Sequence, residues 1–232
     1  MNNIGIIGAM DEEVDILVNL MEVNEVIEKA SLKFYKGKLE NKDVVVVRCG
    51  IGKVNSALCA QILISEFNVE AVVNTGVAGA LNSELDVFDI VISTDAIEYD
   101  FDTTVFGHKK GEIPRMETST FIADERLIDF AYNSSINEVK NHKVLKGRVI
   151  TGDRFISSKE LKDELVKEFD AYCGEMEGAS IAHVCYLNKT PFVIIRAMSD
   201  KADGSADVVY DEFVKDAAHN SKDIVLNMLK SM

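Results

Sequence analysis

The chain has little positive charge for its length. Its 232 residues include 25 lysines and arginines against 39 aspartates and glutamates, which gives a formal net charge of −14. Nucleic acids and anionic membrane surfaces are bound by basic patches that neutralise phosphates. We therefore expect no nucleic-acid partner and no membrane partner. A small neutral or cationic ligand fits this charge better.

Cysteine and histidine are also scarce, with four of each. The cysteines, Cys49, Cys59, Cys173 and Cys185, form no Cys-x-x-Cys pair, and the histidines are scattered. These spacings lack the pattern of a zinc site or of a disulfide framework. We expect no metal and no disulfide, and we expect the cysteines to pack as small buried side chains.

Proline is nearly absent, with two residues, and no low-complexity tract or linker separates one part of the chain from another. We therefore expect one domain over residues 1–232. The first residues, MNNIGIIGAMDEEVD, have no basic leader and turn acidic after a short apolar run. This pattern matches neither a secretory signal nor a membrane span, so a cytoplasmic protein is expected.

Short runs rich in valine and isoleucine alternate with helical patterns. This alternation predicts an α/β fold with a central mixed, largely parallel sheet flanked by helices. Strands are expected at residues 3–10, 32–50 (two strands with a turn near Asn41 and Lys42), 69–76, 87–100, 144–153 and 191–200. Helices are expected at 11–21, 52–67, 123–135, 158–169, from about Glu177, and at 207–232, with an irregular loop over 100–118.

Four of the expected strands end in segments that contain glycine or an acid: GAMDEE, NTGVAGA, TGDRFI and RAMSD. Ligands of open parallel sheets bind beyond the carboxyl ends of the strands. The four segments are therefore expected to share one pocket. NTGVAGA lacks the spacing and the basic residue of a phosphate loop. CGIGKVNSA is a weak candidate for an anion loop, and a tight strand-to-helix turn explains it equally well.

Three acids, Asp11, Glu12 and Glu13, begin the first expected helix. Acids in a first turn offset the helix dipole, which is a sufficient role for all three. Asp11 is a natural helix cap, and Glu12 is easily left to solvent. Glu13 is therefore the candidate for a further role, although spacing alone does not separate the three.

Two more acids occupy unusual places. Glu177 heads an apolar helical stripe, and a buried carboxylate needs a partner. Asp200 ends the apolar strand FVIIRAMSD, with Ser199 beside it. Two carboxyls with different pKa values can hydrolyse a glycosidic bond, one as acid and one as base. A third carboxylate, such as Glu177 beside Glu13 and Asp200, can accept hydrogen bonds from sugar hydroxyls.

Several segments together resemble one family. IGIIGAMDEEV, CGIGKVNSA, NTGVAGAL, TGDRFI, EMEGASIAHV and VIIRAMSDKAD occur in the order and at the spacing of the 5'-methylthioadenosine/S-adenosylhomocysteine nucleosidases, which have the purine nucleoside phosphorylase-like fold. The resemblance spans nearly the whole chain. It implies hydrolysis of the bond between adenine and ribose, a nucleoside substrate, no cofactor, and a part in methionine salvage.

The resemblance also implies roles for individual residues. Glu13 matches the base that activates water, Asp200 the acid that protonates adenine, and Glu177 the acceptor of ribose hydroxyls. The remaining matches are Phe155 and Ile156 at adenine; Gly79, Met176, Met10 and Ile51 at the ribose and its thioether; Ser199, which would orient Asp200; and Arg196, which would steady the acids.

Members of the family are dimers, so the resemblance implies a homodimer in which the loop around Phe106 and Pro114 reaches the neighbouring subunit's pocket. Val77, His108 and Tyr210 depart from common family residues. Two alternatives remain, a phosphate-dependent phosphorylase and a nucleoside-binding module without catalysis. The acidic first loop would repel phosphate, and a binder gains little from three desolvated carboxylates.

Overall fold

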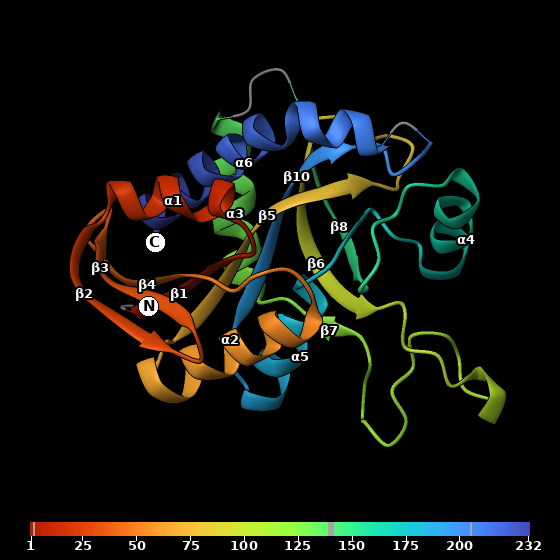
Figure 1. The fold of residues 1–232 in the computed structure, drawn as a ribbon, viewed down its shortest axis with the longest axis horizontal. Coiled ribbons are helices and arrows are strands. Elements are labelled where there is room, and N and C mark those ends of the chain that lie inside the picture. Colours follow the sequence, from red (N-terminus) through yellow and green to blue (C-terminus); the bar gives the residue numbers. More distant parts are fainter. Residues whose placement is uncertain (2, 139–141, 205) are drawn as a thin grey trace.

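The computed structural model describes all residues except 2, 139–141 and 205, and does not describe the side chains of residues 137, 138 and 206–212. Its centre is a mixed sheet of ten strands. The expected α/β architecture is confirmed (Figure 1). The helices are α1 (Asp11–Leu20), α2 (Lys53–Phe67), α3 (Glu125–Glu138), α4 (Lys159–Phe169), α5 (Gly178–Asn188) and α6 (Ala206–Ser231).

The first part of the sheet is built around β1 (Asn3–Gly8), which runs parallel to β4 (Lys42–Arg48) and to β5 (Ala71–Ala80). The central residues of these strands are buried and mostly apolar, as parallel strands covered on both faces should be. Beyond β4 the sheet continues antiparallel through β3 (Leu32–Leu39) to β2 (Glu22–Lys29). Sequence reasoning missed β2 because this edge strand is almost wholly exposed and has no apolar face.

The second part of the sheet closes on itself. β5 pairs with β10 (Phe192–Asp200), which pairs with β6 (Ile90–Glu98), and β6 pairs with β8 (Val144–Thr151). The short strand β9 (Cys173–Glu175) then joins β8 back to β5. This ring brings the ends of β5, β9 and β10 together, and it is the feature of the fold that positions the site.

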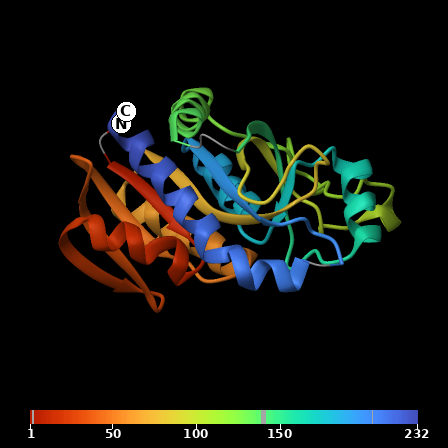
Figure 2. The same cartoon turned by 90° about the horizontal axis from the view of Figure 1, so that it is seen from above.

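Helices cover both faces of the sheet. In Figure 1, α1, α3 and α6 lie on one face, and α2 and α5 pack together on the other. Figure 2 shows α6 running across the sheet beside α1. The aliphatic residues of the central strands and helices form the main core between these layers. In the part of the chain that the structure describes, no helix is long and apolar enough to cross a membrane.

The expected loop at residues 100–118 is irregular apart from one 3-10 turn, Thr104–Phe106. Sequence reasoning missed β9 and β7 (Phe121–Ile122), because strands of three and two residues give no periodic signal. The last strand and the helix that follows Glu177 lie where they were expected.

Candidate active site

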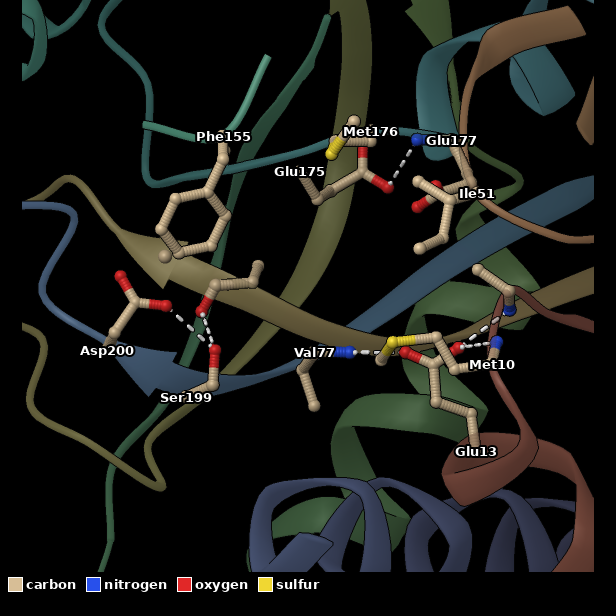
Figure 3. Close-up of a pocket in the computed structure, with 14 residues that line it drawn as sticks. Met10, Glu13, Ile51, Val77, Phe155, Glu175, Met176, Glu177, Ser199 and Asp200 are labelled. Carbon is tan, nitrogen blue, oxygen red and sulfur yellow. Dashed lines mark hydrogen bonds between the residues drawn. The ribbon is translucent and has the colours of Figure 1, made fainter. Parts of the chain in front are cut away.

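A cavity of about 390 Å³ lies where the carboxyl ends of β1, β5, β9 and β10 meet (Figure 3). All four of the glycine-bearing or acidic segments that were expected to share a pocket contribute to its wall, which confirms that prediction. The lining residues are Ala9, Met10, Glu13, Ile51, Val77, Ala78, Gly79, Phe155, Gly174, Glu175, Met176, Glu177, Ser199 and Asp200. We call the four buried acids Glu13, Glu175, Glu177 and Asp200 the floor of this cavity.

Glu13 is held by backbone N–H groups from two strand ends. Ala9 and Met10 donate to its Oε2 over 2.6 and 3.0 Å, and Val77 donates to Oε1 over 3.1 Å. Burial raises the pKa of Glu13, while Arg196 and these donors oppose the rise. Gly76 allows this close approach, because a Cβ there would stand 2.4 Å from Oε1.

The expected role of Asp11 as the cap of α1 is wrong. Met10 occupies the N-cap position, and the Glu13 carboxylate accepts the Met10 N–H. Asp11 instead is exposed and pairs with Arg48 over 2.6 Å. The first-turn acid that caps the helix is therefore the same acid that faces the cavity.

Glu177 is the N-cap residue of α5, and its carboxylate points away from its own helix. Its partner is the Gly52 N–H, which donates to Oε1 over 2.8 Å. Gly52 has a φ of +98°, a left-handed conformation that favours glycine. The segment CGIGKVNSA, which was a candidate anion loop, thus binds the carboxylate of Glu177. Burial first, and then the charge of Glu175, raise the pKa of Glu177 to about 8.

Asp200 ends β10 with two donors on its carboxylate. Ser199 Oγ donates to Oδ2 over 2.9 Å, and the Ala202 N–H donates to Oδ1 over 2.7 Å. The expected contact between Ser199 and Asp200 is therefore present. Burial raises the pKa of Asp200, with the two hydrogen bonds acting against it. A carboxyl group with a raised pKa keeps its proton closer to neutral pH, as a general acid requires.

Arg196 lies behind the cavity wall and does not line it. Its Nη2 donates to Glu175 Oε2 and, over 2.6 Å, to Asn74 Oδ1. Sequence reasoning missed Glu175. The apolar helical stripe singled out Glu177 alone, so the second acid of the same segment was not considered. A signal was available, because Glu175 and Arg196 carry opposite charges and each lies inside a largely apolar segment.

The opposite side of the cavity is partly open, and we call Met10, Ile51, Phe155 and Met176 its rim. Ile51 is 56% exposed and Phe155 is 43% exposed. Figure 3 shows Phe155 on the side of Asp200, and Met10 and Ile51 toward Glu13 and Glu177. Gly79 lines the wall beside Asp200, and Ile156 lines a small adjoining cavity of about 30 Å³.

Of the three departures from the family pattern, Val77 is in the cavity wall. His108 lies on the loop 100–118, where its Nδ1 is 2.8 Å from Glu112 Oε1. The side chain of Tyr210 lies outside the described residues. No group of three or more His, Cys, Asp or Glu side chains that could hold a metal ion occurs in the described part of the chain.

The Phosphorylase superfamily model matches residues 3–230. A 5'-methylthioadenosine/S-adenosylhomocysteine nucleosidase of Staphylococcus carnosus is 43% identical over 230 residues, which cover 99% of this chain and 100% of that protein. The chain belongs to this nucleosidase family. The crystal structure of the Neisseria meningitidis nucleosidase in complex with methylthio-immucillin-A is 39% identical, with a TM-score of 0.95 over 100% of both chains.

A second relative differs in its substrate. The futalosine hydrolase of Helicobacter pylori is 34% identical to this chain, with a TM-score of 0.94 over 100% of this chain and 98% of that one. The family fold and the predicted α/β class are therefore confirmed.

Proposed function

We propose that the chain hydrolyses the N-glycosidic bond of 5'-methylthioadenosine and S-adenosylhomocysteine, and of 5'-deoxyadenosine, to release adenine and a 5'-substituted ribose. The observation that supports this most directly is the composition of the cavity wall. Four carboxylic acids line it, and no lysine, arginine or histidine is among its described lining residues. Such a wall suits acid and base chemistry on a neutral nucleoside and repels phosphate.

In this proposal Asp200 is the general acid. It protonates the adenine ring as the bond to ribose breaks, and Ser199 fixes the direction of its carboxyl group through their hydrogen bond. Phe155 stacks on the base, with Ile156 at the same end of the cavity. Gly79, which the resemblance assigned to the ribose, lines both the main cavity and the small cavity beside Ile156. Protonation of the leaving group is favourable because burial raises the pKa of Asp200.

Glu13 is the proposed general base that activates water. Burial strengthens this carboxylate as a base, and its three backbone donors fix its position. Glu177 accepts hydrogen bonds from the ribose hydroxyls and stabilises the positive charge that develops on the sugar ring. Met10, Ile51 and Met176 contact the ribose and its 5' substituent, and Arg196 steadies the acids from behind the wall. No cofactor takes part.

The test is adenine release by the purified protein from methylthioadenosine and S-adenosylhomocysteine, with and without phosphate. We expect rapid release in phosphate-free buffer and no stimulation by phosphate. Release that requires phosphate, with a ribose 1-phosphate product, would identify a phosphorylase instead. Tight binding of the nucleosides without any adenine would identify a binding module.

We further propose that residues 1–232 act as one domain within a cytoplasmic homodimer. Four buried cysteine thiols suit a reducing compartment. The loop 100–118 presents Val105 and Phe106, which are 84% and 79% exposed, and exposed apolar groups on a long loop favour a contact surface. Light scattering should give twice the 25.6 kDa chain mass, and Phe106→Asp should lower the measured mass toward that of one chain. A monomeric wild-type protein would rule the dimer out.

A further inference from the structure

Glu175, to which none of the proposed catalytic roles is assigned, lies at the centre of a buried polar network. It is the last residue of β9, and its side chain is 3% exposed. Thr151 Oγ donates to its Oε1, and Arg196 Nη2 donates to its Oε2. Asn74 extends the network, because it accepts from Arg196 and donates to the Ile7 carbonyl over 3.0 Å. The network thus connects β1, β5, β8, β9 and β10 beneath the cavity.

The same carboxylate also caps helix α5. The N–H groups of Glu177 and Gly178 donate to Glu175 Oε2 over 3.1 and 2.7 Å. The next N–H, from Ala179, donates to Thr151 Oγ over 2.7 Å. The first N–H groups of a helix have no partner within it, and an N-cap carboxylate usually folds back to accept from one of them.

Glu177 is the N-cap residue of α5, yet its side chain makes no such capping bond. Because Glu175 and Thr151 satisfy the first N–H groups, the Glu177 carboxylate is left to reach Gly52 and the cavity. Figure 3 shows the two acids side by side, joined by the bond from the Glu177 N–H to the Glu175 carboxylate. Capping and chemistry are therefore divided between neighbouring acids.

Glu175 also neutralises the charge of Arg196. The charges of Glu175, Arg196 and Glu13 all act on the pKa of Glu177. Arg196 attracts Glu13 and Glu177 as well, but it forms its ion pair with Glu175. Without a negative charge at position 175, this buried guanidinium would be compensated only by the acids proposed to do the chemistry.

We propose that Glu175 is a positioning residue for the hydrolysis: it takes over the capping of α5 and the neutralisation of Arg196, so that Glu177 faces the ribose. This inference rests on the proposed function, because the reaction gives Glu177 its task. In this proposal Glu175 acts through Glu177 and Arg196.

Glu175→Gln is the variant that tests the charge. The amide oxygen can remain at the Oε2 position and accept the same N–H groups, while its NH₂ can donate to Thr151 Oγ, so the fold should be retained. We expect kcat for adenine release to fall about 10- to 100-fold with a much smaller change in KM. The acid limb of the kcat/KM profile should move to lower pH, because loss of the repelling charge and an unpaired Arg196 both lower the pKa of Glu177.

Thr151→Val tests the position without changing any charge. It removes the hydroxyl that bonds both Glu175 and the Ala179 N–H. We expect kcat to fall about tenfold with an acid limb at the wild-type pH. Glu12→Gln is the control, since it removes an exposed acid of α1, on the opposite face of the sheet from α5, and should leave both quantities unchanged.

Wild-type kcat and an unmoved acid limb in Glu175→Gln would overturn the proposal. If that variant does not fold, an unchanged kcat in Thr151→Val would overturn it instead. Absence of adenine release by the wild-type protein is a different failure, that of the proposed function. The capping role is then judged without substrate by amide hydrogen exchange. Exchange should be faster at Ala179 in Thr151→Val, which lacks the accepting hydroxyl, and faster at Gly178 in Glu175→Ala, which lacks the accepting carboxylate. Unchanged exchange at these two amides would refute the capping role.

Discussion

The floor and the rim of the cavity are built in opposite ways. Every floor acid is buried and accepts at least one hydrogen bond from a backbone N–H group, as Glu13 and Asp200 do. The rim residues Ile51 and Phe155 are half exposed and apolar. Groups fixed in advance need no reorganisation when charge develops, whereas exposed apolar surface gains by being covered. We therefore propose that the floor determines the chemistry and that the rim determines which nucleoside is preferred.

The largest effect should come from Asp200→Asn on the floor. The amide can keep the Ala202 N–H bond with its oxygen and donate to Ser199 Oγ, so the fold is retained. It has no proton to give to the adenine ring, and kcat should fall about 10²- to 10⁴-fold. Stopped adenine-release assays with Asp86→Asn, an exposed acid paired with Lys201, as control would check this. Turnover close to wild type would remove Asp200 from the role of acid.

Glu177→Gln should have the next largest effect, about 10²-fold on kcat with little change in KM. The amide oxygen can still accept the hydrogen bond from the Gly52 N–H, but a neutral group cannot stabilise the positive charge on the ribose. Steady-state kinetics with methylthioadenosine separate the two constants. A change confined to KM would mean that Glu177 only binds the ground state.

The same variant should be more stable than the wild type in alkaline buffer. The folded-state pKa of Glu177 is raised to about 8, so its contribution to stability is fully present below the unfolded pKa of about 4.5 and is lost as pH rises through about 8. Glutamine has no such loss. The melting temperature of Glu177→Gln should therefore exceed that of the wild type by a few degrees at pH 8 and by little at pH 4. Equal melting temperatures at pH 8 would show that burial does not disfavour the charged form of Glu177.

The sequence predicted more of the rim and of the strand ends than of the network beneath them. Ser199 and Asp200 could be found because they end a strand of apolar residues, and Glu177 because it heads an apolar stripe. Glu175 could not be separated from Glu177 by periodicity, since it lies on a strand of three residues. The capping role assigned to Asp11 failed because the first helical position is set by φ and ψ at Met10, which composition does not reveal.

On the rim, Phe155→Ala should weaken substrate binding more than catalysis. Stacking of a base on an aromatic side chain contributes about 1–3 kcal/mol, so KM should rise about tenfold or more while kcat changes less. Phe155→Leu keeps apolar area but no ring, and it should recover only part of the loss. The assay is the KM of both variants for methylthioadenosine. A leucine variant indistinguishable from the wild type would show that contact, and not stacking, is what Phe155 supplies.

The smallest effect should come from Ile51→Ala at the open end of the rim. Ile51 is half exposed, so the ligand rather than the fold covers its side chain, and removal should cost about 1 kcal/mol, or about fivefold in kcat/KM. That loss should appear with methylthioadenosine and be smaller with 5'-deoxyadenosine, which lacks the thioether. Val54→Ala, an exposed valine on α2 that does not line the cavity, is the matched control. Equal losses on the two nucleosides would place Ile51 at the ribose and not at its 5' substituent. The part of the cavity that distinguishes nucleosides would then begin nearer to the opening than Ile51.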